Sequence, residues 1–207
     1  MANSNSSAPS VSLGALLRRR RMTRRFLGGP SPLDISALCT LALRAPSAGF
    51  SQGSHFLVLT DLDLRKFWDV SGAGDWFRST ASGVLEASCV VLILGDQDAY
   101  TKRYSKPDKV AHGLDHADHW VTPYWLTDAA MAAENLLLLI EEQHWGALLF
   151  GLFGDPRTVL DAFGVPESVS CVGAVAVGYR HPEDQPSGSP TTRSRRPTDE
   201  VIHVGHW

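Results

Sequence analysis

The sequence predicts a domain that combines α-helices with β-strands, and three stretches indicate this. Residues 88–94 form a continuous apolar run of strand length, which Gly95 and Asp96 end. Residues 171–177 form a second such run. Residues 125–142 are the longest helical candidate and are apolar on almost every face, so we expect a buried helix. With 207 residues, of which 43% are hydrophobic, the chain can form one domain with a proper core.

The N-terminal part of the chain alternates between the two kinds of element. Ser12 is a candidate N-cap for a short helix that leads into a run of arginines. Residues 34–43 show helical spacing until Pro46 stops them. Residues 55–60 are predicted to form a strand, and Asp61 begins another helix.

The C-terminal part ends in a segment of different character. Residues 147–150 are predicted to form a short strand, and Asp155 followed by Pro156 is the typical opening of a helix. Residues 179–207 are rich in Pro, Ser, Thr and Arg, yet they end in apolar side chains. Such a segment has little core of its own. We therefore expect an arm that packs against another surface, such as a second subunit.

Domain limits and compartment follow from composition. The first ten residues lack the charged start and apolar stretch of a signal peptide, so we expect a disordered tail at 1–11 and one domain over 12–207, including the arm. The longest apolar stretch is interrupted at Glu134 and is too short to span a bilayer, so we expect no membrane association. Three widely spaced cysteines are predicted to be buried reduced thiols, which suits a cytoplasmic protein: Cys39, Cys89 and Cys171.

Two arginine clusters lie near opposite ends of the chain, at residues 20–25 and 193–196. Planar guanidinium groups bind phosphate bidentately, so the clusters could converge on one phosphorylated ligand. A solvated helix end or a nucleic-acid arm is the alternative interpretation of the first cluster. The net charge of −3 and the lack of a second basic stripe with interleaved aromatics argue against nucleic acid. A small anionic ligand fits better.

With the turn at residues 45–52 between them, these clusters resemble motifs of the FMN-dependent nitroreductase family. That family has an N-terminal Arg-Arg-Ser-x-Arg-x-Phe, a Pro-Ser-Ser-x-Asn-x-Gln turn and a C-terminal Lys/Arg-Ser-Arg-x-Pro around the flavin. The resemblance covers residues 12–207. It implies an α+β fold with a central mixed sheet flanked by helices, and a homodimer with exchanged C-terminal arms and two FMN sites at its interface.

The resemblance also implies roles for the arginines. Three of them would hold the FMN phosphate: Arg20, Arg193 and Arg195. Arg24 would lie near the pyrimidine edge of the flavin, where a cation stabilises the reduced ring. Arg21 matches the second arginine of the motif. Met22 stands where the family has a hydroxyl group, so that phosphate hydrogen bond would need another donor, such as Thr23 or a backbone N–H.

In the central turn, the resemblance implies that three residues line the flavin ring of the partner subunit: Pro46, Ser47 and Ala48. Gln52 would lie nearby, and Phe50 replaces the asparagine of the family, which suggests an altered substrate pocket. The alternative is a plain helix stop, in which Ser47 makes a local hydrogen bond and Gly49 takes positive φ. Both interpretations stay open from the residues alone.

The implied reaction is ping-pong electron transfer from NAD(P)H through FMN to a small-molecule acceptor such as a nitroaromatic or a quinone. Phe150 and Gly151 stand where the family places a backbone N–H against flavin N5. No side chain need act as acid or base, so we expect no catalytic residue. The alternatives are a flavoprotein of the same fold with other chemistry, as a dehydrogenase or with a deazaflavin, and a flavin-binding storage module without turnover.

Residues 97–125 are rich in histidine and aromatic side chains. His112, His116 and His119 have helical spacing, but cysteines and close carboxylates are missing, so we expect no metal site. We expect instead an aromatic lid over a planar cofactor, made of four residues: Tyr100, Tyr104, Trp120 and Tyr124.

Overall fold

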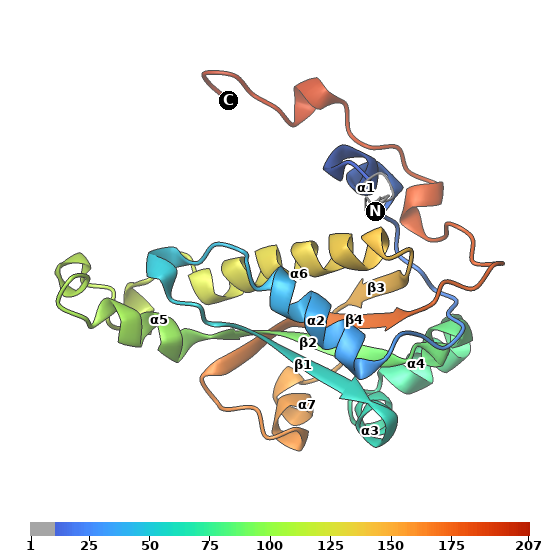
Figure 1. Cartoon of the computed structure of the whole chain (residues 1–207). Helices are drawn as coiled ribbons and strands as arrows, with labels where there is room; N and C mark the ends of the chain where they lie inside the picture. The colour runs from blue at the N-terminus through green and yellow to red at the C-terminus, as the bar shows by residue number, and fades with distance from the viewer. Residues whose placement is uncertain (1–10) are drawn as a thin grey trace, which may run out of the picture.

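The structure is a computed structural model that describes residues 11–207, so the expected tail lies, except for its last residue, outside the described residues. A four-stranded sheet in the order β1-β2-β4-β3 occupies the centre of the molecule (Figure 1). Its strands are β1 (Ser54–Thr60), β2 (Cys89–Asp96), β3 (Gly146–Phe150) and β4 (Val169–Gly178). The α+β class expected from the resemblance is confirmed.

Helices cover both faces of the sheet (Figure 1). On one face lie α2 (Pro32–Ala42) and α6 (Tyr124–Glu142), with α1 (Leu13–Arg19) against α6. On the other face lie α3 (Asp61–Val70), α4 (Ala73–Thr80) and α7 (Pro156–Ala162), whereas α5 (Gln97–Tyr104) follows β2.

The alternation of side chains along β2 explains why that strand is a continuous apolar run. Val91 and Ile93 pack with α2 and α6, whereas Val90 and Leu92 pack with α3 and α4 on the opposite face. A strand covered on both faces needs apolar residues at every position. The long helix over 125–142 is confirmed as α6, and the same burial explains its composition.

The helix starts follow the predicted caps. The Ser12 side chain accepts a hydrogen bond from the backbone of α1, and Asp155 caps α7 with Pro156 at its first position. Ser31 and Asp34 form a reciprocal capping box at the start of α2. These local signals position the helices without long-range information.

The sheet departs in one detail from the mixed sheet that the resemblance implied. All pairs among the four strands are antiparallel. Parallel pairing occurs at single bridges, Met22 to Ala147 and Gly28 to Ala87. The segment around Met22 is extended but pairs with β3 over too short a length to form a strand of its own.

The C-terminal arm runs away from the body of the molecule and passes α1 (Figure 1). Every residue from 185 to 207 is exposed, including Val201, Ile202 and Trp207. Between residues 11 and 207, no helix has both the length and the apolar character needed to cross a membrane.

Candidate functional site

The first arginine cluster lies on an extended segment beside β3. The backbone nitrogen of Thr23 donates to the carbonyl oxygen of Ala147 at 2.8 Å. Successive side chains of an extended chain point to opposite sides, and Thr23 is fully buried. Arg24 therefore points away from the core, and its guanidinium lies 3.3 Å from the carbonyl oxygen of Ser187 on the arm.

One arginine from each cluster lines the same pocket. Arg20 and Arg195 meet there with Arg18 and Glu134, around a volume of about 540 Å³. Glu134 belongs to α6, and its Oε1 lies 3.8 Å from Arg20 Nε. The two clusters, which are far apart in sequence, thus each contribute one arginine to this pocket.

Two arginines differ from the prediction: Arg18 lines this pocket although it was not predicted to, and Arg193 was predicted to bind the phosphate but does not line the pocket. Arg18 lies in the last turn of α1, and its membership of the same basic run was the available signal. Arg193 is exposed on the arm, two residues before Arg195, and does not line this pocket.

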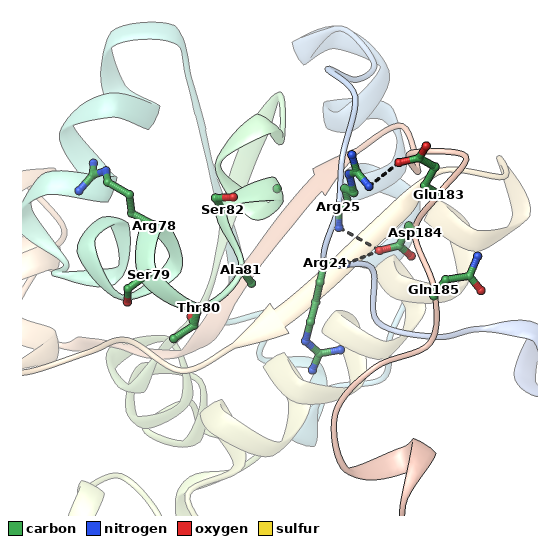
Figure 2. Close-up of a pocket in the computed structure, with 11 residues that line it drawn as sticks. Arg24, Arg25, Arg78, Ser79, Thr80, Ala81, Ser82, Glu183, Asp184 and Gln185 are labelled. Carbon is green, nitrogen blue, oxygen red and sulfur yellow. Dashed lines mark hydrogen bonds and ion pairs between the residues drawn. The ribbon is translucent and has the colours of Figure 1, made fainter.

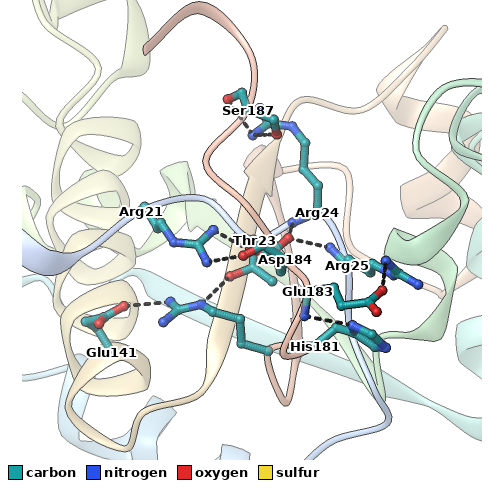
Figure 3. Close-up of polar contacts among 10 residues, drawn as sticks. Arg21, Thr23, Arg24, Arg25, Glu141, His181, Glu183, Asp184 and Ser187 are labelled. Carbon is teal, nitrogen blue, oxygen red and sulfur yellow. Dashed lines mark hydrogen bonds and ion pairs between the residues drawn. The ribbon is translucent and has the colours of Figure 1, made fainter. Parts of the chain in front are cut away.

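Arg21 is engaged elsewhere. Its guanidinium forms an ion pair with Asp184, whose side chain is 2% exposed (Figure 3). The same carboxylate accepts hydrogen bonds from the backbone nitrogens of Arg24, at 3.0 Å, and Arg25, at 2.9 Å. The second arginine of the motif thus joins the cluster to the base of the arm.

A second buried carboxylate holds the other side of the segment. Glu141 accepts from Arg19 Nε at 2.7 Å and from Arg180 Nη2 at 2.9 Å. Arg180 Nε in turn donates to the Thr23 hydroxyl at 3.1 Å (Figure 3). Because that hydroxyl is buried against Arg180, it is not placed to replace the hydroxyl that Met22 lacks.

Arg24 and Arg25 also line a second polar pocket, of about 530 Å³ (Figure 2). Its walls are residues 78–83, which run from the last turn of α4 into the segment after it, and residues 183–185 at the base of the arm. Figure 2 shows residues 78–82 on one side of the pocket, and on the other side Arg24 and Arg25, whose backbone hydrogen bonds to Asp184 are drawn as dashed lines.

The central turn is built by local and long-range hydrogen bonds. Ser47 Oγ accepts from the backbone nitrogen of Gln52 at 3.0 Å, which is the local bond of the helix-stop interpretation. The backbone nitrogen of Ala48 donates to the buried carboxylate of Asp128 at 2.9 Å. Pro46 is exposed ahead of the turn.

Three residues of this turn have positive φ, and one of them is an exposed aromatic residue. Gly49, Phe50 and Gln52 have φ of 60°, 56° and 53°. Phe50 is 74% exposed and, with Ser47 and Gln52, lines a pocket of about 270 Å³. This pocket shares no lining residue with the pocket of Arg20 and Arg195. Within one chain, Arg20 and Arg195 therefore line a different pocket from Ser47, Phe50 and Gln52.

Phe150 and Gly151 end β3. The Phe150 ring packs inward against Trp68, with ring centroids 6.1 Å apart, and against Phe77 at 5.2 Å. Gly151 is exposed directly after it. The side chain thus belongs to the core, and the backbone after the strand is what the site could use.

The expected aromatic lid is wrong for its central members. Tyr100 and Trp120 are buried in a small core of their own with Trp125, and Trp120 contacts Tyr104 and Tyr124 edge-on. The Tyr100 hydroxyl donates to Asp128 at 2.7 Å, and burial together with that carboxylate raises the pKa of Tyr100 well above its usual range. Aromatic rings that fill each other's surroundings cannot cover a ligand.

The three histidines of this region lie on exposed turns. His119 Nδ1 is 2.7 Å from the carbonyl oxygen of Gly113. In residues 11–207 no group of three or more His, Cys, Asp or Glu side chains is arranged to hold a metal ion.

Comparison with known proteins relates this chain to one family. The model of the nitroreductase family matches residues 17–179. A protein of Archaeoglobus fulgidus named "Putative NADH dehydrogenase/NAD(P)H nitroreductase" is 25% identical over 158 residues, which are 73% of this chain and 74% of that protein.

Solved structures share the fold. One from Exiguobacterium sibiricum, described as a "putative nitroreductase in complex with FMN", matches with a TM-score of 0.71 at 16% identity and covers 96% of this chain and 100% of that one. The nitroreductase CinD of Lactococcus lactis, in complex with 4-nitrophenol, matches with a TM-score of 0.72 at 18% identity and covers 93% and 99%.

Proposed function

The chain belongs to the nitroreductase family, and we propose that it is an FMN-dependent oxidoreductase. In this proposal it takes electrons from NAD(P)H and delivers them, by ping-pong, to a small-molecule acceptor such as a nitroaromatic or a quinone. The observation that carries the proposal is the convergence of Arg20 and Arg195 on one pocket. The names of the relatives, which include an FMN complex and an NAD(P)H nitroreductase, support the same cofactor and reductant.

The residues of that pocket fit a phosphate group. Arg18, Arg20 and Arg195 offer guanidinium donors, which bind phosphate oxygens in a forked geometry. Glu134 lies 3.8 Å from Arg20 and would compete with a phosphate for that guanidinium. We assign Arg193 to the same phosphate, because it precedes Arg195 on the exposed arm.

Arg24 and its pocket suit the polar edge of a flavin. Arg24 lines the 530 Å³ pocket, and its guanidinium donates hydrogen bonds of 3.3–3.4 Å to the carbonyl and hydroxyl oxygens of Ser187. Arg24 can therefore turn to a ligand without leaving a buried carboxylate unpaired. A cation at this place would stabilise negative charge on the reduced ring.

We assign the ring-lining residues of the turn to a second copy of the chain. Ser47 and Phe50 line a pocket other than the phosphate pocket of their own chain, so a homodimer would complete each site with the partner's turn, which also carries Pro46, Ala48 and Gln52. Exposed apolar side chains on α1, α2 and the arm favour such an association: Leu13, Leu17, Leu41, Val201 and Ile202.

The bound flavin would supply the hydride chemistry, and the chain would bind and orient it. We assign the backbone N–H of Gly151 to the flavin, because Gly151 is exposed and directly follows β3. A backbone donor keeps its proton at every pH of interest. We assign no side chain as an acid or base.

The decisive experiment starts from purified protein saturated with FMN. Released cofactor is identified by mass spectrometry, and NADH or NADPH is then mixed with the holoprotein without oxygen. We expect FMN rather than FAD, bleaching of flavin absorbance by at least one nicotinamide, and its return on adding a nitroaromatic or quinone. Bound flavin that neither nicotinamide reduces would contradict the proposal and favour a storage protein or another reductant.

A further inference from the structure

We propose that Asp184 is a positioning residue that sets the distance between the two arginine clusters of the phosphate site. The inference rests on the proposed function, because it assumes that Arg20 and Arg195 bind the FMN phosphate. It concerns a residue outside both motifs, which does not line the pocket of Arg20 and Arg195.

Asp184 binds the first cluster through three groups. Its carboxylate pairs with the Arg21 guanidinium, and Oδ1 accepts from the backbone nitrogens of Arg24 and Arg25 at 3.0 and 2.9 Å (Figure 3). Arg21 Nη2 also donates to the Asp184 carbonyl oxygen at 2.8 Å. A buried carboxylate with this many donors holds the extended segment in one position.

Asp184 is also the last buried residue of the chain. Before it, the backbone is paired with the first cluster, since the nitrogen of His181 donates to the carbonyl oxygen of Arg25 at 3.0 Å. A turn closed from Asp184 N to the His181 carbonyl oxygen, at 2.8 Å, follows. Beyond Asp184, every residue of the arm is exposed. The path of the arm from this point to Arg195 therefore starts from the position that Asp184 takes.

Asp184 therefore connects the two clusters. It holds the segment that carries Arg20 and Arg24, and it is the fixed end of the arm that carries Arg193 and Arg195. The additional bonds from Arg24 to Ser187 extend the same connection by three residues. Loss of the carboxylate should loosen the approach of the arm arginines to Arg20 while leaving the sheet and its helices in place.

The test compares Asp184→Asn with Asp161→Asn in full-length protein. Both remove a carboxylate charge that pairs with an arginine, but Asp161 lies on α7 with its side chain 66% exposed, in an ion pair with Arg157. Affinities for FMN and for riboflavin, which lacks the phosphate, are measured by fluorescence titration. We expect Asp184→Asn to weaken FMN binding by about tenfold or more, from the loss of charge-assisted bonds, and riboflavin binding by a clearly smaller factor, because riboflavin has no phosphate for the arm arginines to bind. Asp161→Asn should change neither affinity by more than about twofold.

Asp184→Glu keeps the charge with one more methylene, so it should recover part of the FMN affinity; it also serves if Asp184→Asn does not fold. Equal losses for FMN and riboflavin would show a general structural role and overturn the inference. Equal FMN affinities in Asp184→Asn and Asp161→Asn would overturn it as well. If the wild-type protein binds no FMN, the proposed function itself fails, which is a distinct result.

Discussion

The Tyr100 hydroxyl donates a 2.7 Å hydrogen bond to Oδ2 of Asp128, and the backbone nitrogen of Ala48 donates to the same oxygen at 2.9 Å. A buried carboxylate thus connects an aromatic core to the turn that carries Ser47 and Phe50. The aromatic residues that composition suggested as a lid act instead as the support of that turn. Their effect on a ligand would come through the backbone of Ala48.

Replacing Asp128 should therefore destabilise the protein and disturb the turn. Asp128→Ala leaves the Tyr100 hydroxyl and the Ala48 N–H buried without their acceptor, which costs about 1–3 kcal/mol for such groups. We expect a lower free energy of unfolding in urea, with Asp63→Asn on the exposed surface of α3 as the control. Equal stabilities of the two variants would contradict the role given to Asp128.

The phosphate assignment predicts that Arg20→Ala and Arg195→Ala each weaken FMN binding by roughly ten- to hundredfold, since charge-assisted bonds contribute about 1.5–3 kcal/mol. Arg65→Ala is the matched control, because Arg65 is exposed on α3, across the sheet from α1. Titration with FMN measures all three. Unchanged affinity in both pocket variants would remove the phosphate site from this pocket.

Phe50 combines an exposed ring with φ of 56°, a conformation that costs L-residues about 1–2 kcal/mol and that asparagine tolerates best after glycine. Phe50→Asn should therefore raise the melting temperature by a few degrees. The same change should lower kcat/KM for quinones or nitroaromatics several-fold, because an aromatic contact contributes about 0.5–1.5 kcal/mol.

Stopped-flow measurement of the two half-reactions separates these effects of Phe50. We expect flavin reduction by the nicotinamide to be less affected than reoxidation by the acceptor. A variant that is slowed in flavin reduction alone would place Phe50 at the cofactor instead of the acceptor.

Stability should fall at alkaline pH because of two buried thiols. Burial raises the pKa of Cys39 and of Cys89 from 9.0 to about 12. A raised pKa in the folded state means that the stabilisation is complete below pH 9 and is lost as pH rises towards 12, by up to about 1.4 kcal/mol per pH unit for each thiol. Urea unfolding between pH 8 and 11 should show a shallower decline in Cys89→Ala than in the wild type; parallel curves would contradict this.

The proposed dimer predicts the behaviour of the arm. Deleting residues 189–207 removes exposed residues and leaves Asp184 in place, so the shortened chain should fold cooperatively but be monomeric and poor in FMN. Light scattering after size exclusion measures the mass. Ile202→Asp should weaken association, whereas Val121→Asp, at a fully exposed position, should not. A flavin-loaded monomer from the shortened chain would refute the role given to the arm in FMN binding and association.

Much of the fold was predictable because its signals are local. Ser12, Asp155 and Pro156 mark helix starts through bonds within a few residues, and the continuous apolar run before Gly95 marks a strand covered on both faces. The antiparallel register was not predictable, since it depends on which strands meet. Histidine and aromatic richness after residue 97 misled for the same reason: composition does not say whether rings face a ligand or each other.

For the candidate site, the sequence by itself determined which chemistry is present: guanidinium groups at both ends, a turn able to take positive φ, and the motif order of one family. Tertiary structure decided which members meet. It brought Arg18, Arg20 and Arg195 to one pocket and gave Arg21 to Asp184. The physical reason is that the sequence states each side chain directly, whereas the partner of a charged group depends on how the folded chain brings distant segments together. Arg21 and Asp184, which are in contact, are more than a hundred positions apart.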